Sequence, residues 1–174
     1  AEIAGAASII AEVDDSRITT RYTQGWVSHR TDSLDEAWKI AKENLDNKTP
    51  CAVAYHGNIV DLLEYLYDKG VHVDLMSDQT SCHMAYDGGY CPQGLTFEQR
   101  TDMLDKDPDG FAKLVDKSLK HHYEMICKFH DKGTYFFDYG NAFLKSVYDA
   151  GVPAKDICKN GENDLDGFVF PSYV

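Results

Sequence analysis

The sequence predicts an α/β fold in which an open parallel sheet carries helices on both faces. Short runs rich in apolar and β-branched residues alternate with longer runs whose apolar residues recur every three to four positions. The alternation occurs at least three times, and strands separated by helices pair in parallel. The 174 residues are 43% apolar and 12% aromatic, so we expect a single domain over residues 1–174 with a substantial core.

Five segments are predicted to form strands, because each is short, apolar and bounded by polar or glycine-containing residues. They are ASIIAEV (7–13), CAVAYH (51–56), VHVDLMS (71–77), GTYFFDYG with its turn (133–140) and FVFP (168–171). Segment 14–31 is polar and contains a glycine, so it is predicted to be mostly loop. The loop DQTSCHMAYDGGYCPQG (78–94) is rich in Gly, Asp and Ser, which disfavours regular structure.

Capping residues mark the expected helix starts. Ser33, with Glu36 three residues later, has the pattern of a capping box and begins a helix that runs to about Asp46. Thr96 caps the next helix, and Pro108 begins one of about 20 residues. Two more helices follow strands directly, over IVDLLEYLYDKG (59–70) and NAFLKSVYDAGV (141–152).

Charge and spacing exclude several classes of function. The chain has 17 Lys and Arg against 29 Asp and Glu, a net charge of −12, which argues against binding to nucleic acid or to an anionic membrane. It contains no apolar run of the roughly 18 residues that a spanning helix needs. The five cysteines form no C-x-x-C pair and the histidines no H-x-x-x-H pair, so we predict free thiols of a reducing cytosol and no metal site.

Four polar clusters follow predicted strands, at the edge where open α/β sheets bind ligands. They are Glu12 to Arg17, Gly57-Asn58, DQTSCH (78–83) and FFDYGN (136–141). Each has a structural alternative: a solvated strand end, an ordinary turn, a self-bonded turn capped by Asp78, and core packing. Together the clusters favour binding of a dinucleotide. Glu12 can accept hydrogen bonds from ribose hydroxyls, and a helix start after Asn58 favours anions.

No G-x-G-x-x-G occurs in the chain. A dinucleotide-binding unit begins with a strand, a Gly-rich turn and a helix. We interpret AEIAGAA (1–7) as the tail of that helix and therefore expect the first strand and the Gly-rich loop to be missing from this chain.

Several segments together resemble the urocanate hydratase (urocanase) family, and the match runs in order over the whole chain. They include IIAEVDDSRITTRYTQGWV (9–27), SDQTSCHMAYDGGYCPQG (77–94), FFDYGNAF (136–143) and DGFVFPSYV (166–174). The most specific parts are D-Q-T-S-x-H and F-D-Y-G-N. The C-terminal sequence is similar to that of the eukaryotic branch of the family.

The resemblance implies the Rossmann-like NAD-binding domain of a larger lyase that works as a homodimer in the cytosol. This hydratase adds water to urocanate, giving imidazolonepropionate in histidine degradation, and uses tightly bound NAD⁺ as an electrophile. The family's catalytic Cys is expected beyond residue 174, so no catalytic residue is assigned here and the chain alone is expected to be inactive.

Carried over by position, the resemblance implies a set of NAD contacts that coincides with the four clusters and the end of the long loop. These contacts are Glu12, Arg17, Asn58, Ile59, Gln79, Thr80, Ser81, Cys82, His83, Tyr90, Cys91 and Tyr139. Ile59 stands where many relatives have Ala, and Cys91 replaces a usual Leu.

Two alternatives stay open from the sequence. One is the domain of a Rossmann-type oxidoreductase that uses NAD for hydride transfer. The other is a flavodoxin-like or receiver-like interaction module, in which Asp138 would be a phosphorylatable residue at a strand end. A thiol nucleophile formed by Cys82 with His83 is disfavoured, because neighbouring residues in an extended segment point to opposite faces.

Overall fold

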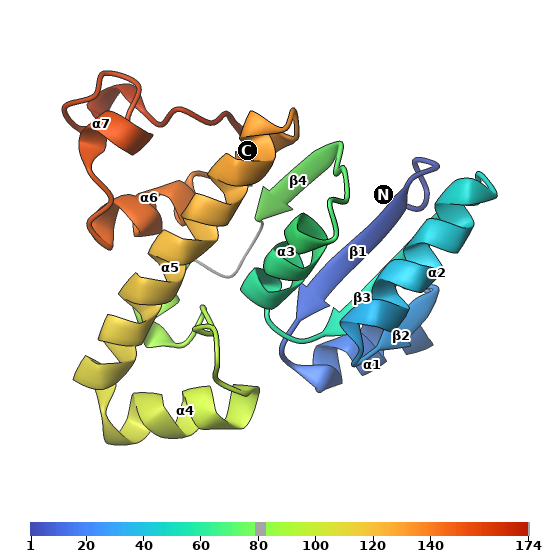
Figure 1. The fold of residues 1–174 in the computed structure, drawn as a ribbon. Helices are drawn as coiled ribbons and strands as arrows, with labels where there is room; N and C mark the ends of the chain where they lie inside the picture. Colours follow the sequence, from blue (N-terminus) through green and yellow to red (C-terminus); the bar gives the residue numbers. More distant parts are fainter. Residues whose placement is uncertain (79–82, 174) are drawn as a thin grey trace. The chain divides into compact units, whose positions relative to one another are not determined.

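The structure is a computed structural model that describes residues 1–78 and 83–173 (Figure 1). The chain divides into two compact units, residues 1–69 and residues 70–174, and each is described by itself. Each unit contains a three-stranded parallel sheet. The predicted α/β class with parallel strands is confirmed, while a single domain over 1–174 stays a prediction. Within the described residues, no helix combines the length and apolar character needed to cross a membrane.

The sheet of the first unit has the order β1-β3-β2, with all strands parallel. Its strands are β1 (Ala7–Glu12), β2 (His29–Thr31) and β3 (Cys51–His56). Because β3 is central, five of its six residues are buried. The register pairs Glu12 with His56, so the ends of β1 and β3 lie at the same edge.

Three helices pack on this sheet. They are α1 (Asp15–Thr23), α2 (Leu34–Asp46) and α3 (Ile59–Asp68). Ile18 of α1 packs with Val27 and with Ala52 and Ala54, which share one face of β3. Helix α2 packs on β1 and β3 (Figure 1) and also contacts α3.

The prediction that residues 14–31 are mostly loop is wrong, because this segment contains α1 and β2. Asp14 begins α1 by accepting the backbone N–H of Ser16 at 3.0 Å. Ile18 is the helix's one buried residue, so the apolar periodicity that identifies a helix is absent from the sequence. The opening residues also differ from the prediction: residues 2–5 form a turn, closed by the Gly5 N–H on the Glu2 carbonyl, not the end of a helix.

The sheet of the second unit has the parallel order β4-β5-β6. Its elements are β4 (Leu75–Asp78), the 3₁₀ helix η1 (Ala85–Asp87), α4 (Phe97–Lys106), α5 (Pro108–Asp131), β5 (Tyr135–Tyr139), α6 (Ala142–Asp149), α7 (Ala154–Ile157), the 3₁₀ helix η2 (Asp164–Asp166) and β6 (Ser172–Tyr173). Helices α5 and α6 pack on β5 and on each other. The Phe136 ring lies between those of Phe143 and Phe170, with centroids 5.9 and 5.2 Å away, and these rings form part of the core.

The predicted strand FVFP is wrong, since β6 is Ser172–Tyr173. Phe168 and Phe170 are both buried, so this apolar segment fills the core. Phe168 makes only an isolated antiparallel bridge to Cys158, and ladder pairing with β5 begins at the carbonyl of Pro171, which accepts the Asp138 N–H. Strand β4 likewise begins at Leu75, four residues later than predicted.

The predicted helix starts are confirmed, with one difference in detail. Thr96 and Gln99 form a full reciprocal capping box at α4. At α2, Ser33 accepts the Glu36 N–H, but the Glu36 carboxylate accepts from the hydroxyl of Thr31 instead of the Ser33 backbone. The cap at α2 is therefore one-sided, because Thr31 at the end of β2 competes for the carboxylate.

Candidate functional site

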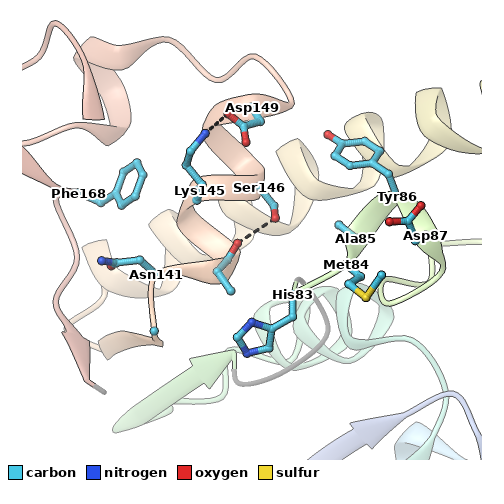
Figure 2. A pocket seen from close by; sticks show the side chains of 12 residues that line it. His83, Met84, Ala85, Tyr86, Asp87, Asn141, Lys145, Ser146, Asp149 and Phe168 are labelled. Carbon is cyan, nitrogen blue, oxygen red and sulfur yellow. Dashed lines mark hydrogen bonds and ion pairs between the residues drawn. The ribbon is translucent and has the colours of Figure 1, made fainter. Parts of the chain in front are cut away.

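A pocket of about 670 Å³ lies in the second unit, next to the segment predicted to contact a cofactor. Figure 2 shows its two walls, one formed by residues 83–87 and the other by residues of the stretch 140–149, which includes all of α6, with Phe168 beside it. His83 lies in the first wall, and Asn141 and Ser146 in the second. Asn141 adopts the left-handed conformation at φ 60° and makes no side-chain cap to α6. The pocket is thus bordered by one predicted contact, His83, and by residues just after another, Tyr139.

The α6 wall has a fixed charge pattern. Lys145 pairs with Asp149 and lies 3.8 Å from Asp164. The hydrogen bond to Asp149 raises the pKa of Lys145, with the nearby carboxylates adding to it. This cation is therefore already neutralised by carboxylates of its own unit.

Asp138 is the next-to-last residue of β5, the strand before α6, and it faces the interior. Only 1% of it is exposed, and Oδ2 accepts the Leu144 N–H at 2.9 Å. Burial raises the pKa of Asp138, and hydrogen bonds from the backbone of Leu144, Phe143 and Tyr139 oppose this rise. Asp138 therefore satisfies donors at the start of α6. A phosphoryl-accepting Asp needs solvent access, so the structure does not support the interaction-module alternative.

Three predicted contacts in this unit have different surroundings. Tyr139 is 43% exposed at the end of β5. Cys91 is half-buried, with its thiol 3.4 Å from the Leu95 carbonyl. Tyr90 is 1% exposed, and its hydroxyl lies 3.1 Å from that of Ser118. The predicted contacts Gln79, Thr80, Ser81 and Cys82 lie outside the described residues, as does the disfavoured pairing of Cys82 with His83.

In the first unit, Glu12 ends β1 with one carboxylate oxygen in use. Oε1 accepts the Asp14 N–H at 3.0 Å, which orients the side chain. Among the residues that the structure describes, no donor contacts Oε2. Glu12 therefore presents an oriented acceptor at the carboxyl edge of the sheet, as recognition of a ribose hydroxyl requires.

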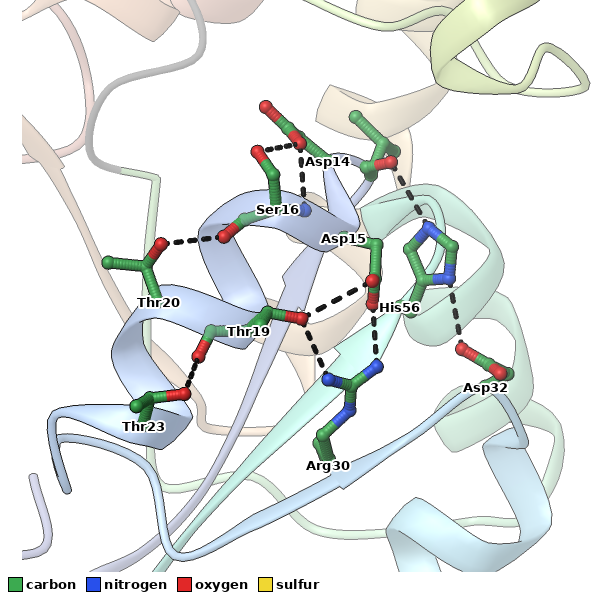
Figure 3. Close-up of polar contacts among 10 residues, drawn as sticks. Asp14, Asp15, Ser16, Thr19, Thr20, Thr23, Arg30, Asp32 and His56 are labelled. Atoms are coloured by element: carbon green, nitrogen blue, oxygen red, sulfur yellow. Dashed lines mark hydrogen bonds and ion pairs between the residues drawn. The ribbon is translucent and has the colours of Figure 1, made fainter.

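Arg17, on the first turn of α1, points largely into solvent. Its side chain is 65% exposed, and Nε donates to Asp14 at 3.3 Å. Asp14 also accepts from the Ser16 hydroxyl at 2.6 Å (Figure 3). The pKa of Asp14 is lowered, first by the hydrogen bond from the Ser16 side chain, with Arg17 contributing.

Asn58 and Gly57 form the predicted turn between β3 and α3. Asn58 is 6% exposed, and its Oδ1 accepts the Val60 N–H at 2.9 Å, so it caps the helix that Ile59 begins. The Gly57 N–H donates to the Glu12 carbonyl at 3.0 Å. A Cβ at Gly57 would come within 2.3 Å of the Tyr55 ring, so only glycine fits the turn with that ring in place.

His56 was not among the sequence-predicted site residues. Its Nδ1 lies 2.9 Å from Asp32 and its Nε2 lies 3.2 Å from the Val13 carbonyl (Figure 3). Both partners are acceptors, so the ring nitrogens of His56 are the donors available to them. His56 thereby joins the loops that follow β1 and β2. The only sequence signal was its position directly before Gly57.

Metal and thiol chemistry have little support in the described part of the chain. Across residues 1–78 and 83–173, no three His, Cys, Asp or Glu side chains gather closely enough to hold a metal ion. Cys51, Cys91, Cys127 and Cys158 are free thiols. Burial raises the pKa of Cys51, Cys127 and Cys158, which makes these thiols poor nucleophiles at neutral pH.

The family model described as the urocanase Rossmann-like domain matches residues 1–174, the entire chain. The chain belongs to the urocanase Rossmann-like domain family. A Rossmann-like domain of urocanase is a nucleotide-binding type of fold, which agrees with the parallel strands and the polar strand ends.

Several curated relatives of this urocanase domain are named urocanate hydratase. Urocanate hydratase of Mus musculus is 40% identical over the whole chain, and that of Homo sapiens is 38% identical. Probable urocanate hydratase of Caenorhabditis elegans is 41% identical, again over the whole chain. The chain covers 26% of each of these proteins, so it spans about a quarter of the length of the curated relatives it matches.

The predicted contacts of the urocanase domain fall in both units. In the first, the structure brings Glu12 to the same sheet edge as the Gly57-Asn58 turn. In the second, it places His83 in a pocket wall and Tyr139 directly before Gly140 of the other wall. All twelve assignments as NAD contacts stay predictions.

Proposed function

We propose that this chain is the NAD-binding domain of a urocanate hydratase. The oriented carboxylate of Glu12 at the end of β1 carries the proposal, because it is the group that a dinucleotide-binding sheet uses for a ribose. The family and the names of the relatives support the wider assignment.

The residues present fit a dinucleotide. Oε2 of Glu12, which no donor among the described residues contacts, suits a ribose hydroxyl, and the Gly57-Asn58 turn lies at the same edge. In the second unit, the half-exposed Tyr139 offers an aromatic face, and His83 offers a polar side chain in the wall of that unit's pocket. When bound, NAD⁺ would supply an electrophilic ring; this chain's own residues would bind and orient it.

For the whole protein we propose the activity that the relatives' names state. It adds water to urocanate to give imidazolonepropionate, a lyase step of histidine degradation, in a cytosolic homodimer. In this proposal, the catalytic Cys and most substrate contacts belong to parts of the protein outside this chain.

The test uses a protein of the relatives' full length that contains this chain. We expect it to deplete urocanate, measured by the loss of urocanate absorbance, without net reduction of NAD⁺. The isolated chain is the control and should leave the absorbance unchanged. No urocanate depletion, together with NAD⁺ reduction by a hydroxy substrate, would instead establish an oxidoreductase.

A further inference from the structure

The segment 84–93, which follows the predicted contact His83 and includes Tyr90 and Cys91, folds on itself and lies on α5. The Met84 carbonyl accepts the N–H groups of Asp87 at 3.1 Å and Gly89 at 2.8 Å, which closes the first turn. Helix η1 within this segment packs on α5. The segment therefore depends on α5 for its position.

Ser118 of α5 contacts this segment twice. Its Oγ accepts the Gln93 N–H at 2.9 Å and lies 3.1 Å from the Tyr90 hydroxyl. Ser118 is 5% exposed and Tyr90 is 1% exposed, so both bonds are shielded from water. A single buried hydroxyl thus holds the segment through its backbone at 93 and through a side chain at 90.

His122, one turn further along α5, extends this cluster. Its Nδ1 lies 3.5 Å from the Tyr90 hydroxyl, and its ring stacks with the Tyr90 ring at 6.3 Å. Burial lowers the pKa of His122 to about 3, so the imidazole is neutral and one ring nitrogen can accept a hydrogen bond. With Nδ1 as acceptor, Tyr90 donates to His122, Ser118 donates to Tyr90, and Gln93 donates to Ser118, so each of these bonds has one donor and one acceptor.

Other contacts hold the earlier part of the same segment. The Tyr86 hydroxyl donates to Asp116 of α5 at 2.6 Å, and the Arg100 guanidinium donates to the Gly88 carbonyl. The Arg100 guanidinium also lies over the Phe97 ring, 4.4 Å from its centroid. These contacts act on residues 86–88, whereas Ser118 acts on residues 90–93.

We propose that Ser118 is a positioning residue for the cofactor site: it fixes the backbone of residues 90–93 so that this backbone, and not the Tyr90 ring, meets the dinucleotide. The inference rests on the proposed function, since it assigns Tyr90 and Cys91 to the NAD site. The Tyr90 side chain serves as the buried anchor, which explains how a fully buried tyrosine can belong to a contact segment.

The experiment compares Ser118→Ala with Tyr123→Phe in the full-length protein. Tyr123 is a matched control because it lies on the same helix, is 5% exposed and donates to the Asp156 carbonyl at 2.8 Å, away from the segment. We expect Ser118→Ala to raise the Kd for NAD⁺ about tenfold, with Tyr123→Phe near wild type. Tyr90→Phe, which keeps the bond from Gln93 to Ser118, should give a smaller rise, and Ser118→Thr should restore part of the affinity.

Amide hydrogen exchange on the same proteins without NAD⁺ separates positioning from general stability. Ser118→Ala should speed exchange in residues 90–93, and Tyr123→Phe should not. An unchanged Kd or unchanged exchange in Ser118→Ala would overturn the inference; if that variant does not fold, Tyr90→Phe with wild-type Kd and exchange overturns it. Failure of the wild-type protein to bind NAD⁺ would overturn the proposed function itself, whatever the exchange shows.

Discussion

The unfolding free energy is expected to fall steeply as the pH is lowered from about 6.5 towards 3, because of His122. This side chain is 2% exposed, and burial, with a smaller effect from His121, lowers its pKa to about 3. Below its ordinary pKa the unfolded chain binds a proton at this histidine and the folded chain does not. Stability from this group is therefore complete above pH 6.5 and is lost as the pH falls, by up to about 1.4 kcal/mol per pH unit.

Denaturant unfolding of the wild type and of His122→Asn, at pH values from 7 to 4, measures this effect. Asparagine at position 122 keeps an acceptor for the Tyr90 hydroxyl, but its side chain does not titrate in this range. The variant should be less stable at pH 7 and show a flatter pH dependence than the wild type. His121→Asn is the control, because His121 is the partly exposed neighbour on the same helix. Parallel pH dependences for His122→Asn and the wild type would contradict the prediction.

Phe143→Ala is expected to lower the unfolding free energy by about 3–5 kcal/mol. Phe143 is fully buried at the start of α6, and its ring centroid lies 4.6 Å from that of His122 and 5.9 Å from that of Phe136. Truncation leaves an apolar cavity where α5, α6 and β5 meet, and cavities lined by apolar side chains stay empty of water.

Phe137→Ala is the matched control for this cavity. Phe137 is the neighbour of Phe136 on β5, but it lies on the opposite face of the strand and is only partly buried, with its ring against Tyr173. Denaturant unfolding should show a smaller loss for Phe137→Ala. Equal losses for both variants would mean that the core of this unit lies elsewhere.

Strong local signals in the sequence predicted much of the fold. Ser33, Thr96 and Pro108 each begin a helix as expected, because capping chemistry depends on a few neighbouring residues. Helix α1 and strand β2 were missed because their stability comes from tertiary contacts. Ile18 is the only buried residue of α1, and β2 has three residues held by pairing with β3.

The site was predictable where polar residues follow a strand and unpredictable where they lie inside helices. Glu12 and Asn58 lie at the predicted edge, although Asn58 also proves to be a helix cap. His56 could not be predicted as a site residue from the sequence, because its role depends on the two loops that it joins in the fold. Ser118 and His122 interrupt the apolar face of α5, and this was the one signal for them; their partner Tyr90 lies about 30 residues away.

Calorimetric titration of NAD⁺ into the full-length protein, with Glu12→Ala and Asp15→Ala beside it, tests the cofactor assignment most directly. Asp15 is the matched control, an acid three residues away that pairs with Arg30 at 2.8 Å. We expect the wild type and Asp15→Ala to bind alike and Glu12→Ala to bind roughly 10- to 100-fold more weakly, the value of a hydrogen bond to a charged group. No binding by the wild type, or equal affinity in all three proteins, would contradict the assignment of this sheet edge to NAD.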